Sequence, residues 1–81
     1  NSIISAGCKI MSTVRNSIFA RGVVAEGGAS VQDSIIMQSC TIKSGARVER
    51  AIIDKDNTVP SNTVVCGTPD DSLVVGKGQM N

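Results

Sequence analysis

The chain has 81 residues, enough for one small domain, and Phe19 is its single aromatic residue although 41% of the chain is apolar. Eight Lys and Arg against seven Asp and Glu leave a net charge of +1, and there is no Trp or Tyr. The chain therefore lacks both the field that attracts nucleic acid or an anionic membrane and the usual base-stacking side chains. No stretch is long and apolar enough to span a bilayer and no signal peptide is visible, so we expect a cytoplasmic protein.

The chain is built from four similar units. They cover residues 1–15, 16–32, 33–49 and 50–65, and they open with the related words NSII, NSIF, DSII and RAII. The first unit is two residues shorter than the second and third. Repetition over most of the chain means that the repeat determines the fold.

Each unit carries bulky apolar residues about six positions apart, and a mostly small residue lies two positions before each of them. The bulky set is Ile4, Ile10, Val14, Phe19, Ala25, Val31, Ile36, Ile42, Val48, Ile53, Val59 and Val65. The small set is Ser2, Cys8, Ser12, Ser17, Val23, Ala29, Ser34, Cys40, Ala46, Ala51, Asn57 and Thr63. A pair at i and i−2 on one face has the period of a strand, and a spacing of six does not fit a helix.

Each stretch of about six residues, which we call a hexad, therefore predicts a short strand followed by a corner. Three hexads close one triangular coil, and the stacked coils form a prism. Coils stacked at about 4.8 Å bury a continuous aliphatic column. The sequence thus predicts an all-β, single-stranded parallel β-helix of about four coils. A β-sandwich of short strands is the competing interpretation, but it would not need a small residue at every i−2 position. The short first unit predicts a tight corner or irregular coil at Met11 to Thr13.

The pattern stops after Val65. We predict β-helix coils over residues 1–65 and a short capping tail over residues 66–81, which would cover the last coil. The chain begins without Met and in the middle of a unit, so we expect it to be part of a longer protein.

Catalytic and metal-binding chemistry finds little support in the residues. There is no histidine, the usual base or ligand in hexapeptide acyltransferases and β-helical carbonic anhydrases. The three cysteines lack CxxC spacing, and Cys8 and Cys40 would lie two coils apart, too far for a disulfide. The acidic pair in the run Asp54 to Asp56 could bind a metal, but a solvated corner is the simpler interpretation. We therefore predict no catalytic and no metal-binding residue in this chain.

One outward column is more suggestive. Arg21, Gln38 and Lys55 should lie on three successive coils, with the two cations roughly 10 Å apart. Such a spacing could hold a phosphate-bearing effector, although a plain polar face would look the same.

The hexad rule resembles the hexapeptide-repeat superfamily, and this resemblance implies a left-handed β-helix. Residues 33–65 are similar to the C-terminal domain of bacterial glucose-1-phosphate adenylyltransferases, the ADP-glucose pyrophosphorylases of glycogen synthesis. The similarity rests on SIIMQ at 34–38, AIIDK at 51–55, and Val59 followed by Pro60. The short segments MQ at 37–38, IDK at 53–55 and VVGKG at 74–78 resemble those of a regulatory-type subunit more than those of the main catalytic subunit.

The resemblance implies a function. The family joins ATP and glucose 1-phosphate into ADP-glucose and pyrophosphate with Mg²⁺ in an N-terminal nucleotidyltransferase domain. The glycine-rich loop of that domain is absent here, so no cofactor is expected in this chain. The β-helix would bind its own N-terminal catalytic domain, form homo-oligomers or hetero-oligomers with a catalytic subunit, and contact a phosphorylated effector. This makes Arg21, Gln38 and Lys55 a candidate contact face, with Arg47 and Arg50 as further cations near an adjacent corner.

Two other functions stay open. The chain could be a hexapeptide acyltransferase or sugar-phosphate transferase whose active site is completed between the prisms of two copies. Saturable binding of acetyl-CoA would reveal such an enzyme. A purely structural spacer would differ from the regulatory domain only in its partner.

Overall fold

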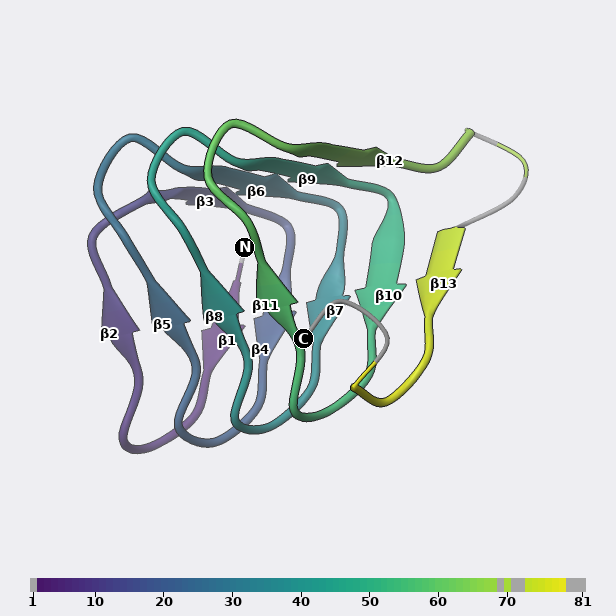
Figure 1. Ribbon diagram of the computed structural model, residues 1–81. Coiled ribbons are helices and arrows are strands. Elements are labelled where there is room, and N and C mark those ends of the chain that lie inside the picture. The colour runs from purple at the N-terminus through teal and green to yellow at the C-terminus, as the bar shows by residue number, and fades with distance from the viewer. Residues whose placement is uncertain (1, 69, 71–72, 79–81) are drawn as a thin grey trace.

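The computed structural model describes residues 2–68, 70 and 73–78. Every regular element in that part of the chain is a strand, and all strand pairs are parallel (Figure 1). The strands form three sheets, which we call sheets A, B and C, and the chain visits them in that order on each coil. The predicted β-helix is confirmed.

The three sheets are the three sides of the prism. Sheet A contains β1 (Ile3–Ile4), β4 (Ile18–Phe19), β7 (Ile35–Ile36), β10 (Ala51–Ile53) and β13 (Leu73–Val75). Sheet B contains β2 (Lys9–Ile10), β5 (Val24–Ala25), β8 (Thr41–Ile42) and β11 (Thr58–Val59). Sheet C contains β3 (Thr13–Arg15), β6 (Ser30–Gln32), β9 (Arg47–Glu49) and β12 (Val64–Cys66).

The strand register reproduces the repeat. Ile18 pairs with Ile35 and Ile35 pairs with Ile52, so the register advances by the same step on both coils. Ile3 pairs with Ile18, which is a shorter step. In sheet B, Lys9 pairs with Val24, which is an equally short step, whereas in sheet C Thr13 pairs with Ser30, which is a full step. The two missing residues therefore lie in the corner between β2 and β3. The tight corner predicted there is confirmed.

The bulky column forms the core of the second, third and fourth coils. Nine inward side chains of these coils are almost fully buried: Phe19, Ala25, Val31, Ile36, Ile42, Val48, Ile53, Val59 and Val65. Each fully buried Ile or Val contributes about 1.5–3 kcal/mol relative to exposure. In the first coil, Ile10 and Val14 are only partly buried and Ile4 is 47% exposed, because no coil covers them on the N-terminal side.

Serines occupy the corner that leads into sheet A on the first three coils, and their hydroxyls bridge one coil to the next. The Ser34 hydroxyl donates to the Gln32 carbonyl at 2.8 Å and accepts from the Ala51 amide at 3.2 Å. The Ser17 hydroxyl does the same one coil earlier, bonding Arg15 and Ser34. Both serines are buried, so the ladder satisfies backbone groups that water cannot reach.

The tail adds a strand in the same direction. Ala51 pairs with Leu73, a longer step than the one between coils, and the Arg50 carbonyl accepts from the Leu73 amide at 3.1 Å. Val75 is buried, so β13 carries sheet A one rung further (Figure 1). The division between coils and tail at residue 65 remains a prediction.

Candidate functional site

The corner between sheets A and B holds the first three candidate residues. The Arg21 carbonyl accepts from the Ser39 amide at 3.1 Å, and the Gln38 carbonyl accepts from the Asp56 amide at 3.3 Å. Arg21, Gln38 and Lys55 therefore occupy one position on three successive coils, and we call this set the Arg21 column. Their role as an effector face remains a prediction.

A fourth residue, which is its third cation, belongs to the same column. The Lys55 carbonyl accepts from the Gly78 amide at 3.3 Å, so Lys77 occupies on the tail the position that Lys55 occupies on the fourth coil. Sequence reasoning missed Lys77 because the step from β10 to β13 departs from the coil period. The local signal was present, since LVVGKG at 73–78 has the same strand and corner pattern as AIIDKD at 51–56.

The backbone at this corner is left-handed on each coil. Ser39 has φ of 61° and Asp56 has φ of 60°, where Gly22 has 72°. A left-handed residue turns the chain sharply into sheet B and leaves the preceding side chain at the outer edge of the corner. This geometry explains why Arg21, Gln38 and Lys55 are all exposed or only partly buried.

Carboxylates moderate the charge of the column. Asp54 and Asp56 flank Lys55 in the chain, and an Asp54 carboxylate oxygen accepts from the Lys55 amide at 2.7 Å. Beneath them the buried Asn57 amide nitrogen donates to the carbonyls of Asp54 at 2.9 Å and Gly76 at 2.8 Å. Asn57 thus ties the corner of the fourth coil to the tail.

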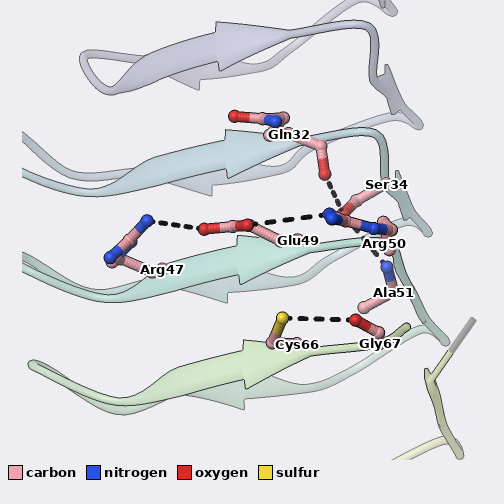
Figure 2. A network of polar contacts seen from close by, with 8 residues as sticks. All are labelled: Gln32, Ser34, Arg47, Glu49, Arg50, Ala51, Cys66 and Gly67. Carbon is pink, nitrogen blue, oxygen red and sulfur yellow. Dashed lines mark hydrogen bonds and ion pairs between the residues drawn. The ribbon is translucent and has the colours of Figure 1, made fainter. Parts of the chain in front are cut away.

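Arg47 and Arg50 lie elsewhere on the prism. Figure 2 shows both cations converging on Glu49, with Arg47 Nη2 at 2.7 Å from Oε2 and Arg50 Nη1 at 3.9 Å from Oε1. Arg47 and Glu49 belong to β9 in sheet C, and Arg50 forms the corner between sheets C and A. Arg50 and Lys55 stand at opposite ends of the β10 side, about 16 Å apart along an extended chain. The structure therefore does not bring Arg47 and Arg50 into the Arg21 column.

The cysteines are all free thiols. Cys40 is buried, and its thiol donates to the Asp54 carbonyl at 3.0 Å. Burial raises the pKa of Cys40, so the thiol remains neutral. Cys8 is half-buried and donates to the Ala20 carbonyl at 3.0 Å, and Cys66 is exposed beside Gly67 (Figure 2). These contacts are those of structural thiols.

Outside the corners, the outer face of sheet A is apolar at its centre. Strand pairing places five aliphatic side chains in one line, which we call the sheet A stripe: Ile3, Ile18, Ile35, Ile52 and Val74. A shallow open hollow at its N-terminal end is lined by Ser2, Ile3, Asn16, Ser17 and Ile18. Sequence reasoning did not single out this stripe, although the register of the repeat contains it.

A family model described as "GlmU-like, C-terminal hexapeptide" matches residues 1–73. The chain belongs to this family. Membership in the GlmU-like hexapeptide family confirms the hexapeptide-repeat prediction and the left-handed β-helix that the resemblance implied. Searches of curated proteins and of solved structures gave no match.

Two further observations define what this hexapeptide domain contains. Among residues 2–68, 70 and 73–78, no group of three His, Cys, Asp or Glu side chains is arranged to hold a metal ion. The same part of the chain contains no helix that is long and apolar enough to cross a membrane.

Proposed function

We propose that this chain is the non-catalytic regulatory and oligomerisation domain of a cytoplasmic glucose-1-phosphate adenylyltransferase-like protein of glycogen biosynthesis. The observation that carries the proposal is the sheet A stripe, an apolar surface on the outside of a prism whose second, third and fourth coils already bury their inward side chains. Contiguous exposed apolar surface is typical of an interaction site. Membership in the GlmU-like hexapeptide family supports an origin beside a nucleotidyltransferase domain.

The resemblance of residues 33–65 supports the finer assignment to ADP-glucose synthesis. ATP and Mg²⁺ would then act in the nucleotidyltransferase domain, and no residue of this chain is assigned to them. The chain would bind that domain. It would also assemble either with further copies of itself, as a homo-oligomer, or with a catalytic subunit, as a hetero-oligomer.

The regulatory part of the proposal concerns the Arg21 column. Among the described residues no ion pair engages Arg21 or Lys55, whereas Glu49 already pairs with Arg47 and Arg50. Two cations separated by the Gln38 amide can each donate to a different oxygen of a phosphorylated sugar. We therefore place the effector contact at Arg21, Gln38 and Lys55, with Lys77 at its end.

Assembly is tested by light scattering on a size-exclusion column. The chain is run alone and then with a catalytic glucose-1-phosphate adenylyltransferase subunit, and ADP-glucose formation by the chain alone is assayed in parallel. We expect a mixed complex and no turnover by the chain itself. Turnover above a blank, or a chain that neither associates with itself nor binds the catalytic subunit, would contradict the proposed function.

The effector contact is tested by calorimetry with fructose 1,6-bisphosphate as the probe. The double variant Arg21→Ala, Lys55→Ala should lose at least about tenfold in affinity, because two charge-assisted contacts are removed. Arg47→Ala is the matched control, since it removes a cation that already pairs with Glu49. Equal losses in the two variants would show a diffuse charge effect and no site at this corner.

A further inference from the structure

The tail strand β13 is held to the prism on one side only. Among the described residues, sheet A alone has a fifth strand. Of the three side chains of β13, Val75 is buried, whereas Leu73 is 42% exposed and Val74 is 62% exposed. Three backbone hydrogen bonds join this part of the tail to the fourth coil: the Leu73 amide to the Arg50 carbonyl at 3.1 Å, the Asp54 amide to the Val75 carbonyl at 2.9 Å, and the Gly78 amide to the Lys55 carbonyl at 3.3 Å. A strand with so few buried contacts is the kind of element that opens locally while the rest of the fold stays intact.

Docking of the tail completes the C-terminal end of the core. Val75 pairs with Ile53, and Ile53 is fully buried although it belongs to the last of the four coils. The buried Asn57 side chain donates to the Gly76 carbonyl at 2.8 Å. On the outer face, Val74 forms the last rung of the sheet A stripe. A docked and an undocked tail therefore differ both inside the prism and on the surface assigned to assembly.

Docking also brings two cations to neighbouring rungs. Strand pairing places Lys55 and Lys77 one strand spacing apart, about 4.8 Å at the backbone. In the part of the chain that the structure describes, neither ammonium group forms an ion pair. Asp54 and Asp56 flank Lys55 in the chain and offset part of its charge. Like charges on adjacent strands oppose pairing, so the docked tail carries an electrostatic cost.

We propose that residues 73–78 form a strap that a multivalent anion locks onto the prism by bridging Lys55 and Lys77. The inference rests on the proposed function and assigns the regulation of its effector contact. The two ammonium groups meet only when the strap is docked, so a bridging anion binds the docked state more tightly and shifts the equilibrium towards it. The oxygens of a phosphorylated sugar can accept from both groups.

The strap also links two surfaces of the domain. Val74 and Lys77 lie on the same short segment, so one docking event sets the last rung of the stripe and the last cation of the Arg21 column. An anion at Lys77 therefore stabilises the complete stripe. Coupling between two binding sites is reciprocal, so a partner that contacts Val74 tightens the binding of the anion by the same factor.

Amide hydrogen exchange of the 81-residue chain, followed by NMR, tests the strap. The Asp54 amide reports docking because it donates to Val75, and the Met37 amide is the matched reference because it donates to Ile53 at 2.8 Å one coil earlier. After correction for intrinsic rates, we expect Asp54 to exchange at least about tenfold faster than Met37, because the strap opens without the coils. Equal exchange of the two amides would show that strap and coils open together and would overturn the proposal.

The locking anion is tested in the same measurement with fructose 1,6-bisphosphate as the probe. At about ten times its dissociation constant the probe should slow the exchange of Asp54 about tenfold and leave Met37 unchanged. Sodium chloride at the same ionic strength screens the repulsion without bridging the two lysines, so it should slow Asp54 less. No slowing at about 10 mM probe, or equal slowing by the probe and the chloride, would contradict the bridge.

Two single-charge variants separate the bridge from a general charge effect. Lys77→Gln should slow the exchange of Asp54 without the probe, because the like-charge contact is gone, and should reduce the response to the probe at least about threefold. Lys43→Gln is the matched control, since Lys43 is an exposed cation at the corner between sheets B and C. It should behave as the unchanged chain. The same response in both variants would leave no role for Lys77 and would sink the inference.

Failure of this inference is distinguishable from failure of the proposed function. A chain whose strap ignores the probe but that binds a catalytic adenylyltransferase subunit removes the strap and keeps the assembly role. A chain whose strap responds to the probe but that neither associates with itself nor binds that subunit keeps the strap and removes the assembly role.

Discussion

The first and third coils obey the same sequence rule but differ in what covers them. Both place two isoleucines and a thiol at equivalent inward positions, which are Ile4, Cys8 and Ile10 in one and Ile36, Cys40 and Ile42 in the other. The third coil lies between two neighbours and its three residues are fully buried, whereas the first coil has a neighbour on one side only. In a solenoid, burial is therefore set by stacking as much as by residue type.

The largest effect should come from a charge in the covered coil. Ile42→Asp places an unpaired carboxylate in a dry aliphatic interior, which costs several kcal/mol against a marginal total stability. We expect loss of the cooperative thermal transition measured by circular dichroism. Ile4→Asp in the uncovered coil should remain folded, as should Gln38→Asp on the outer face. Similar losses for Ile42→Asp and Ile4→Asp would mean that the N-terminal coil is covered in solution.

Truncation of equivalent residues in the two coils gives a smaller and more quantitative comparison. Ile36→Ala should destabilise the protein by about 2–5 kcal/mol, because it removes buried methyl groups and leaves a cavity. Ile4→Ala should cost below about 1.5 kcal/mol, since Ile4 is already half exposed. Urea unfolding at constant m-value measures both. Equal costs would show that exposure at the N-terminal end does not reduce the contribution of Ile4.

The hydroxyl ladder provides the next contrast. Ser34→Ala removes a donor and leaves the Ala51 amide unsatisfied inside the protein, so we expect a loss of about 1–3 kcal/mol. Ser2→Ala removes the acceptor of the Ser17 amide, a 3.3 Å contact from an exposed residue, and should cost below about 1 kcal/mol. The reverse order in urea unfolding would contradict the ladder as a source of stability.

The smallest effect concerns the thiols. With a thiol-reactive dye under native conditions, Cys66 should react first, Cys8 more slowly and Cys40 only on opening of the coil.

Because the pKa of Cys40 is raised in the folded state, its contribution to stability is fully present below the ordinary thiol pKa and is lost as pH rises through the folded value. Cys40→Ala should remove this alkaline decline, and an unchanged pH profile would contradict it.

The coil pattern was predictable because a constant repeat period encodes register directly. Ile18, Ile35 and Ile52 align by counting alone, and so do Arg21, Gln38 and Lys55. Counting fails where the period changes. The step from Ala51 to Leu73 is longer than the coil period, and for that reason Lys77 was not recognised as a member of the Arg21 column.

By itself, the sequence determined the number of sides, the inward columns, the tight corner in the first coil and the absence of histidine chemistry, since each depends only on residue type and spacing. The tertiary structure alone decided three other features. It leaves Ile4 exposed, it places both Arg47 and Arg50 within ion-pair distance of Glu49, and it aligns Val74 with Ile52 although their separation in the chain departs from the coil period. Each of these depends on which groups meet in space, and a repeat period carries that information only for coils that have neighbours and keep the period.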